Sequence, residues 1–341
     1  MTPPLVSIVV PVYNTAEFLP ECLDSLCRQT LQNIEIICID DGSTDYSPEV
    51  LQKYAEKDSR IRIISKKNGG LASARNAAFS CVRGEFILFV DSDDSIAATL
   101  CEKTVEKIQA SNAEAVFFYF DGYTDENGKL LWTLPFASWS PNDREKLRSK
   151  LELQRYSSAW NRLYRTRFLL DNNIRFPEGL LFEDYPFHWK VLLLSNRLSI
   201  VAEKLYHYRY RPGSLSLQRS EKLGDIIPIT EIVRTFLKEH GYYEENFVRL
   251  TFIRERLNII WQRYAQMEES LQPAMQTAIM NSLDEDDIRI INDGGGLSVR
   301  ARLFYDGILA GNGGVSKLRQ IYRFICGAVR GCIYRVLFFQ K

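Results

Sequence analysis

Four consecutive residues, Asp91-Ser92-Asp93-Asp94, carry the strongest chemical signal in the sequence. Carboxylates this close repel one another unless they are solvated or bound to a cation. A hard divalent ion such as Mg²⁺ or Mn²⁺ takes a few carboxylates together with phosphate oxygens. Two aspartates separated by one residue can therefore bridge a metal ion and a neighbouring ribose or phosphate. Short acidic turns are common, so the position of this turn in the fold decides its meaning.

Two further polar clusters have the chemistry to bind a nucleotide. Asp41 begins an Asp-Gly-Ser-Thr-Asp turn, and its carboxylate can accept a hydrogen bond from a nucleobase imide. The alternative is a simple turn in which Ser43 or Asp45 caps the next helix. Residues 68–76 form a glycine loop that leads into a helix, where small residues let a ligand approach the backbone and the helix start favours anions. Arg75 adds a planar cation for a base or a diphosphate.

Alternating strands and helices must position these clusters. Apolar runs predict buried strands at 5–10, 34–39, 61–64 and 86–90, and apolar residues at helical spacing predict helices between them, with a further helix near 98–110 and an apolar run at 115–120. Such alternation implies a mostly parallel sheet with right-handed crossovers, in which ligands bind beyond the carboxyl ends of the strands. The clusters at 13–14, 40–41 and 91–94 all follow strands, so we expect them at one edge of the sheet. The alternative for any one cluster is that a strand end needs polar turn residues.

The pattern changes after residue 120. From about 121 to 150 it becomes loop-like, and from 151 to 215 it is aromatic-rich and mixed. Residues 206–214 alternate like a strand, with His207, Arg209 and Arg211 on one face. Residues 221–283 have helical periodicity.

The ordered motifs resemble the large bacterial glycosyltransferase family 2. They are Pro11-Val12-Tyr13-Asn14, Asp40-Asp41-Gly42-Ser43-Thr44-Asp45, Asn68-Gly69-Gly70 with Ala74-Arg75-Asn76, and Asp91-Ser92-Asp93-Asp94. The resemblance is close over about 5–120 and looser to about 215. It implies an α/β GT-A fold, a Rossmann-like mostly parallel sheet flanked by helices with a helical C-terminal extension. It also implies inverting transfer from a nucleotide diphosphate sugar, usually a UDP-sugar. We therefore predict a catalytic domain at 1–215, with a nucleotide-binding half at about 1–120 and an acceptor half at about 121–215, followed by a helical region at 216–341.

The resemblance also implies roles for the motif residues. The residues expected around the donor nucleotide are Pro11, Tyr13, Asn14, Asp41, Asn68, Gly70, Arg75, Asp91 and Ser92. Asp93 is the expected ligand of Mn²⁺ or Mg²⁺, with Asp91 at the ribose or as a further contributor to the metal site. The role of Asp94 stays open.

A second acidic element, Glu183-Asp184, resembles the family segment in which an aspartate is the expected base. Displacement at an anomeric carbon needs a base that takes the proton of the acceptor hydroxyl. The resemblance assigns this role to Asp184, with Glu183 beside it. Flanking apolar residues would raise the pKa of this carboxyl by desolvation. The alternative is an acidic pair that interacts with the dipole of a helix N-terminus.

Four side chains outside the acidic elements have further predicted roles. Arg209 and Arg211 would close over the diphosphate, and His207 would be a further metal ligand; the alternative is a strand with a solvated basic face. Trp160 lies in a Trp-Asn-Arg-Leu-Tyr segment that also resembles the family, although the family usually has lysine where Arg162 stands. Trp160 would stack on a donor or acceptor sugar, or else be a buried core residue.

The acceptor is expected to be a hydroxyl of a bacterial surface glycan precursor (capsule, O-antigen, exopolysaccharide or lipopolysaccharide), and the donor UDP-Gal, UDP-Glc or UDP-GlcNAc. Two alternatives stay open. A sugar-phosphate nucleotidyltransferase would also use a metal, but it typically has a basic glycine-rich loop after the first strand, where this chain has Pro11-Val12-Tyr13-Asn14. A non-catalytic sugar-nucleotide-binding partner of another transferase would not need both acidic elements.

Bulk composition sets the remaining expectations. Lys+Arg and Asp+Glu both number 43, which does not favour a nucleic-acid binder. The seven cysteines form no Cys-x-x-Cys pair, which predicts reduced thiols. The N-terminus does not resemble a signal peptide and no run approaches a spanning length, so we expect a cytoplasmic protein. The basic amphipathic segment at 315–341 would contact the inner face of an anionic membrane, or else pack on the preceding helices or on a second subunit.

Overall fold

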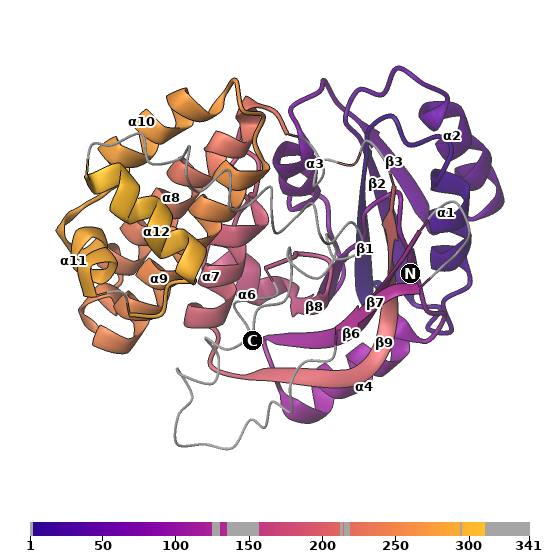
Figure 1. Cartoon of the computed structure of the whole chain (residues 1–341). Coiled ribbons are helices and arrows are strands. Elements are labelled where there is room, and N and C mark those ends of the chain that lie inside the picture. The colour runs from indigo at the N-terminus through magenta and orange to yellow at the C-terminus, as the bar shows by residue number, and fades with distance from the viewer. Residues whose placement is uncertain are drawn as a thin grey trace. The chain divides into compact units, whose positions relative to one another are not determined.

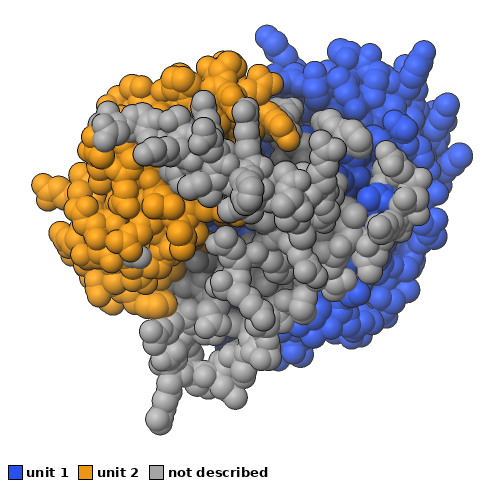
Figure 2. Space-filling model, in the orientation of Figure 1, with its two compact units in different colours: residues 1–217 blue, residues 218–341 orange. Residues whose placement is uncertain are grey.

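The computed structural model describes residues 3–124, 130–134, 157–211, 214, 219–293 and 295–310. The chain forms two compact units, residues 1–217 (unit 1) and 218–341 (unit 2), which are coloured separately in Figure 2. The predicted basic segment at 315–341, with Cys326 and Cys332, lies outside the described residues. Within the described ranges, no helix is long and apolar enough to cross a membrane.

From β1 (Val6–Val12) to β4 (Phe86–Phe89), unit 1 alternates strands and helices in the predicted order (Figure 1). Its elements are β1 (Val6–Val12), α1 (Leu19–Cys27), β2 (Ile34–Asp40), α2 (Ser47–Lys57), β3 (Ile61–Ser65), α3 (Leu71–Ala78), β4 (Phe86–Phe89), β5 (Ser95–Ile96), α4 (Leu100–Ser111), β6 (Ala115–Thr124), β7 (Leu130–Leu134), β8 (Arg162–Arg165), α6 (Thr166–Asp171), α7 (Asp184–Leu194) and β9 (Leu198–Tyr210). The strands and helices predicted before residue 120 are confirmed, with small shifts at their ends.

The described strands form one sheet in the order β3-β2-β1-β4-β8-β6-β9-β5, with β7 paired to β6. The first four run parallel, so their carboxyl ends meet at one edge of the sheet. Strand β8 is antiparallel to both β4 and β6, and β9 runs parallel to β6. The predicted α/β sheet flanked by helices is therefore confirmed. Its antiparallel pairs are those made by β8, β7 and β5.

The sheet is buried on both faces, which explains why its central strands read as continuous apolar runs. In β1 the side chains of Val6, Ile8 and Val10 pack in one core cluster with residues of α1, α2 and α4. Val9, which points to the opposite face, packs with residues of α3, α6 and α7. Among the described residues the cysteines are free thiols, as predicted; they are Cys22, Cys27, Cys38, Cys81 and Cys101.

The prediction of a loop from about residue 121 was wrong at its start. Strand β6 continues to Thr124, and β7 pairs with it. The physical reason is the long partner strand, because β9 pairs with β6 as far as Tyr210 and places polar Asp121 opposite His207. Ladder hydrogen bonds thus extend β6 beyond its apolar run. Residues 125–129 and 135–156 lie outside the described part of the chain.

Unit 2 is helical over its described residues, as the periodicity predicts. Its elements are the 3-10 turns η3 (Glu221–Asp225) and η4 (Tyr242–Glu244) and the helices α8 (Ile226–Glu239), α9 (Asn246–Gln266), α10 (Gln272–Ser282), α11 (Glu285–Asp293) and α12 (Val299–Leu309).

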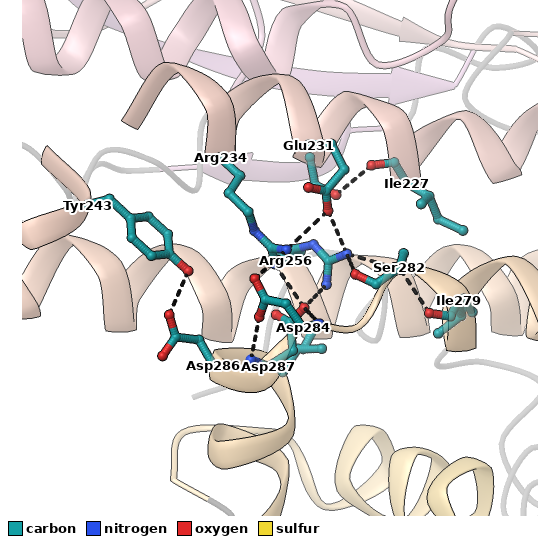
Figure 3. Close-up of polar contacts among 12 residues, drawn as sticks. Ile227, Glu231, Arg234, Tyr243, Arg256, Ile279, Ser282, Asp284, Asp286 and Asp287 are labelled. Carbon is teal, nitrogen blue, oxygen red and sulfur yellow. Dashed lines mark hydrogen bonds and ion pairs between the residues drawn. The ribbon is translucent and has the colours of Figure 1, made fainter. Parts of the chain in front are cut away.

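A buried ion cluster joins three helices of unit 2 (Figure 3). Asp287, on α11, accepts hydrogen bonds at 2.8 Å from Arg234 on α8 and Arg256 on α9. Arg234 also pairs with Asp284 at 2.8 Å, and Arg256 pairs with Glu231 at 2.8 Å. The side chains of Arg256 and Asp287 are both 0% exposed, so each charge depends on its partners.

Candidate active site

The loops after β1, β2 and β4 are tied together by side-chain hydrogen bonds. Asn14 has a left-handed backbone (φ 51°), its side-chain Oδ1 accepts from Thr44 N at 2.8 Å, and its own N donates to Ser43 Oγ at 3.2 Å. Thr15 Oγ1 donates to Ser92 Oγ at 2.9 Å. Asparagine tolerates the left-handed region because its short amide can bond locally. The structure therefore brings three of the sequence motifs together at one edge of the sheet.

Asp41 organises the glycine loop that begins α3. Its carboxylate accepts from Gly69 N at 3.0 Å and from Gly70 N at 2.8 Å, and it pairs with Lys66 Nζ at 2.7 Å. Gly70 has φ 87°, a conformation that glycine adopts without strain. Asp41 is 2% exposed, so its oxygens bind protein donors at the floor of the loop.

The other residues expected around the nucleotide differ in exposure. Tyr13 is 49% exposed directly after β1, and Asn68 is exposed in the glycine loop. Pro11 is buried within β1. Tyr13 and Asn68, like Asn14 and Gly70, therefore present surface to a ligand.

The acidic turn follows β4, and β9 is bound to it. Tyr206 donates its hydroxyl proton to Asp94 Oδ2 at 2.6 Å and accepts from Asp91 N at 3.2 Å. Asp94 Oδ1 accepts from Arg209 N at 2.7 Å. Burial raises the pKa of Asp94 well above its usual range, and repulsion from Asp93 and Asp91 adds to the rise. Asp94, whose role the sequence leaves open, thus connects the acidic turn to β9.

The two arginines predicted to close over the diphosphate, Arg209 in β9 and Arg211 directly after it, both contact the acidic turn. Arg209 Nε donates to the backbone oxygen of Asp93 at 2.9 Å, and its Nη2 pairs with Glu21. Arg211 Nε pairs with Asp93 Oδ2 at 2.9 Å. Both guanidinium groups lie over the ring of Phe18, at 5.3 and 4.8 Å from its centroid. The structure therefore places two cations beside the carboxylate predicted to bind the metal–diphosphate.

Arg75 connects the acidic turn to the second acidic element. Its Nη2 pairs with Asp91 Oδ1 at 2.7 Å, and its Nη1 pairs with Glu183 at 2.9 Å and Asp184 at 2.6 Å. Asp184 is the first residue of α7, and its second oxygen accepts from Ala159 N at 3.0 Å. Residues far apart in the sequence thus surround one guanidinium group.

Burial dominates the titration of the Glu183–Asp184 pair. It raises the pKa of Glu183 to about 7, with repulsion from Asp184 adding to the rise and Arg75 opposing it. Burial also raises the pKa of Asp184, and Arg75 opposes that rise. Both shifts make these carboxylates better proton acceptors than exposed ones.

Trp160 lies in an aromatic stack and is 6% exposed. Its ring is stacked on Tyr206, with centroids 4.3 Å apart, and on Tyr208 at 5.8 Å. Phe120 meets it edge-on at 4.6 Å. These contacts favour the core role over a role as a free sugar platform.

The predicted metal ligands are Asp91, Asp93 and His207, and their surroundings decide whether a divalent ion fits at the acidic turn. His207 Nδ1 lies 2.8 Å from Asp121 Oδ1, its cross-strand neighbour. Within the described ranges, no group of three or more His, Cys, Asp or Glu side chains could hold a metal ion. Mg²⁺ is commonly bound by one or two carboxylates with the rest of its shell from phosphates and water, and Asp91 and Asp93 are such a donor set. The residues therefore fit an ion that arrives with a diphosphate.

Sequence reasoning missed three contributors to this site. Tyr206 supports the acidic turn, Phe18 lies under the arginines, and Ala159 donates to Asp184. The alternation in 206–214 placed Tyr206 on the face opposite His207, but only the fold shows its partner. A backbone donor such as that of Ala159 has no sequence signature.

Comparisons with known proteins agree with this architecture. The family model of glycosyl transferase family 2 matches residues 7–171. The chain is 37% identical over 219 residues to EpsJ of Bacillus subtilis (strain 168), named an uncharacterized glycosyltransferase; the match covers 62% of this chain and 63% of EpsJ, slightly under two thirds of its length. It is 32% identical over 246 residues to the glycosyltransferase GlyG of Streptococcus pneumoniae serotype 4, covering 69% of this chain and 79% of GlyG.

The fold is similar to that of a solved transferase. The crystal structure of S. aureus TarS 1-349 in complex with UDP-GlcNAc superposes with a TM-score of 0.60 at 24% identity, covering 90% of this chain and 92% of that one. The chain belongs to glycosyltransferase family 2. The family and enzyme class predicted from the motifs, and the GT-A fold, are thereby confirmed.

Proposed function

We propose that this chain is an inverting glycosyltransferase that moves a sugar from a UDP-sugar to a hydroxyl of a bacterial surface glycan precursor, with Asp184 as the general base. One observation carries the proposal. Asp91 of the acidic turn and Asp184 bind the same guanidinium group, that of Arg75, at 2.7 and 2.6 Å. Direct displacement needs the base and the leaving diphosphate close to one anomeric carbon, which this arrangement supports.

Asp184 has the environment of a general base. Its side chain keeps 22% of its surface exposed, while Oδ1 accepts from Arg75 and Oδ2 accepts from Ala159 N. Burial raises its pKa and strengthens it as a proton acceptor, while Arg75 stabilises its ionised form. In the proposed reaction Asp184 takes the proton of the acceptor hydroxyl as that oxygen attacks the anomeric carbon.

Exposed residues at the strand ends would bind the donor nucleotide. The Tyr13 ring is exposed at this edge, and Asn68 and Gly70 lie on the adjoining loop. A UDP-sugar is supported by the TarS structure, which contains UDP-GlcNAc. UDP-GlcNAc, UDP-Glc and UDP-Gal are the donors we propose.

The acidic turn and the arginines at 209 and 211 would bind the diphosphate. Asp93, with Asp91, would hold Mn²⁺ or Mg²⁺ there. Such an ion, when bound, neutralises the charge that develops on the departing diphosphate. Arg209 and Arg211 contact the same turn and add fixed positive charge on the diphosphate side.

The two alternatives are less well supported. Membership of a glycosyltransferase family favours sugar transfer over nucleotidyl transfer. A non-catalytic partner would not need a buried arginine that holds a candidate base beside the donor-side carboxylate.

UDP release by the purified full-length protein tests the proposal. UDP-GlcNAc, UDP-Glc and UDP-Gal are supplied one at a time with Mn²⁺, with GDP-mannose as the mismatched donor. We expect UDP release from at least one UDP-sugar and no GDP release. A protein that binds UDP yet releases none from any of the three, with or without added glycan fractions, would contradict the proposal.

A further inference from the structure

Arg75 is buried among its ion-pair partners. The guanidinium group is 1% exposed, and its two terminal nitrogens pair with three carboxylates. Its Cζ lies 5.3 Å from the centroid of the Phe176 ring, which stacks on Phe187 of α7 at 4.0 Å. Three carboxylates and the Phe176 ring therefore surround the group, which leaves 1% of its surface for the expected contact with a base or ribose.

Holding Arg75 between three carboxylates leaves one of its donors unpaired. Its Nε is buried and has no hydrogen-bond partner among the described residues. An unsatisfied buried donor costs about 1–3 kcal/mol. The side chain keeps this geometry because its terminal nitrogens are fixed at 2.6–2.9 Å from their partners.

The environment is asymmetric between the two candidate bases. Asp184 accepts from Arg75 and from Ala159 N, whereas both carboxylates stand at the start of α7, where the helix dipole favours a negative charge. Glu183 shares Nη1 of Arg75 and is 9% exposed. The charged and titratable groups that face Asp184 are Arg75, Asp91, Arg162, Tyr164 and Glu183. Of the pair, Asp184 is the better-stabilised anion.

We propose that Arg75 is a positioning residue, which fixes the ionised carboxylate of Asp184 relative to the donor-side carboxylate of Asp91, and that it is not a donor ligand. This inference rests on the proposed function. The fork of the guanidinium group is essential, because one planar cation spans both carboxylates. A lysine ammonium is a point charge and cannot bridge them in the same geometry.

Arg75→Lys separates positioning from donor binding. We expect UDP to bind with a Kd within about threefold of the wild-type value, measured calorimetrically with Mn²⁺. We expect kcat for UDP release to fall about 100-fold, the scale expected when a reacting group is misplaced by about 1 Å. The acid limb of the pH–rate profile should move to higher pH, because the anion of Asp184 loses stabilisation.

Arg60→Lys is the matched control. Arg60 pairs with Asp58 at 2.6 Å and donates to Cys27 O at 2.8 Å, so the same change disrupts a guanidinium–carboxylate pair outside the site. We expect an unchanged kcat and pH profile. If Arg75→Lys does not fold, Arg75→Lys/Glu183→Gln removes one of the three carboxylates and is compared with Glu183→Gln alone.

The outcomes are distinct. A Kd that rises tenfold or more with kcat retained makes Arg75 a donor ligand and overturns the inference. Unchanged kcat and pH profile in Arg75→Lys, beside an active wild type, overturns the inference alone. A wild-type protein that binds UDP and Mn²⁺ but releases UDP from no UDP-sugar overturns the proposed function and this inference with it.

Discussion

The hydroxyl of Tyr206 donates to Asp94 Oδ2 at 2.6 Å, although 112 residues separate the two in the chain. The same hydroxyl accepts from Asp91 N at 3.2 Å. One side chain of β9 therefore holds both ends of the acidic turn, and the turn and the arginines at 209 and 211 are parts of one assembly.

Tyr206→Phe tests this assembly. The change leaves the buried carboxyl of Asp94 without its hydroxyl donor, which should lower the free energy of unfolding by about 1–3 kcal/mol. UDP affinity in the presence of Mn²⁺ should fall as well, because the turn and β9 lose their connection. Tyr54→Phe is the control, since Tyr54 of α2 donates to Asp24 of α1 at 2.7 Å in an exposed hydrogen bond. Equal UDP affinity in the Tyr206→Phe and wild-type proteins would show that the hydrogen bond serves stability alone.

Asp93→Asn tests the metal site. The variant keeps the shape of the side chain but loses the charge, so Mn²⁺-dependent binding of UDP should weaken at least tenfold while the melting temperature changes little. Excess EDTA should reduce wild-type UDP release to background. Asp24→Asn, at a half-exposed carboxylate on α1, should bind like the wild type. Full UDP release in EDTA would remove the metal from the account.

Glu183 gives unit 1 a pH-dependent stability. Burial raises its pKa from 4.5 to about 7, so between these values the folded chain keeps a proton that the unfolded chain has lost. The stabilisation is complete below pH 4.5 and is lost as the pH rises to about 7, a change on the order of 3 kcal/mol. Glu183→Gln should therefore flatten the dependence of the melting temperature on pH between 5 and 8. Glu203→Gln, at an exposed ion pair, should keep the wild-type slope, and a Glu183→Gln protein that keeps it too would refute this assignment.

Asp287 should be essential to unit 2. Removing one partner of a buried ion cluster leaves uncompensated charge, so Asp287→Ala, which strands Arg234 and Arg256, should cost about 3–5 kcal/mol in a thermal or denaturant unfolding experiment. Asp286→Ala is the neighbouring control, because Asp286 is 26% exposed and meets Tyr243 at 3.1 Å. Similar losses in the two variants would mean that the buried position of Asp287 confers no special stability.

The sequence predicted the parts of unit 1 that depend on local pattern. Apolar runs such as Val6–Val10 are buried on both faces and read as strands wherever they occur, and their polar ends follow from the parallel topology. The extension of β6 to Thr124 was missed because it depends on pairing with β9, not on its own composition.

The same distinction applies to the site. The motif residues were identifiable, since each carries its chemistry in its own side chain. The burial of Arg75 and the partner of Asp94 were not, because their contacts come from residues 109 and 112 positions further along the chain. Such contacts belong to the tertiary fold and have no sequence spacing that reveals them.

UDP release by wild-type protein and by Asp184→Asn, measured with Mn²⁺ on the UDP-sugar that the donor panel identifies, tests the central claim most directly. The substituted amide would keep the side-chain shape and the hydrogen bond from Ala159 N, but it cannot accept the acceptor's proton. The account predicts that the variant binds UDP with the wild-type Kd and releases UDP at least 100-fold more slowly. Release at the wild-type rate would contradict the assignment of Asp184 as the base.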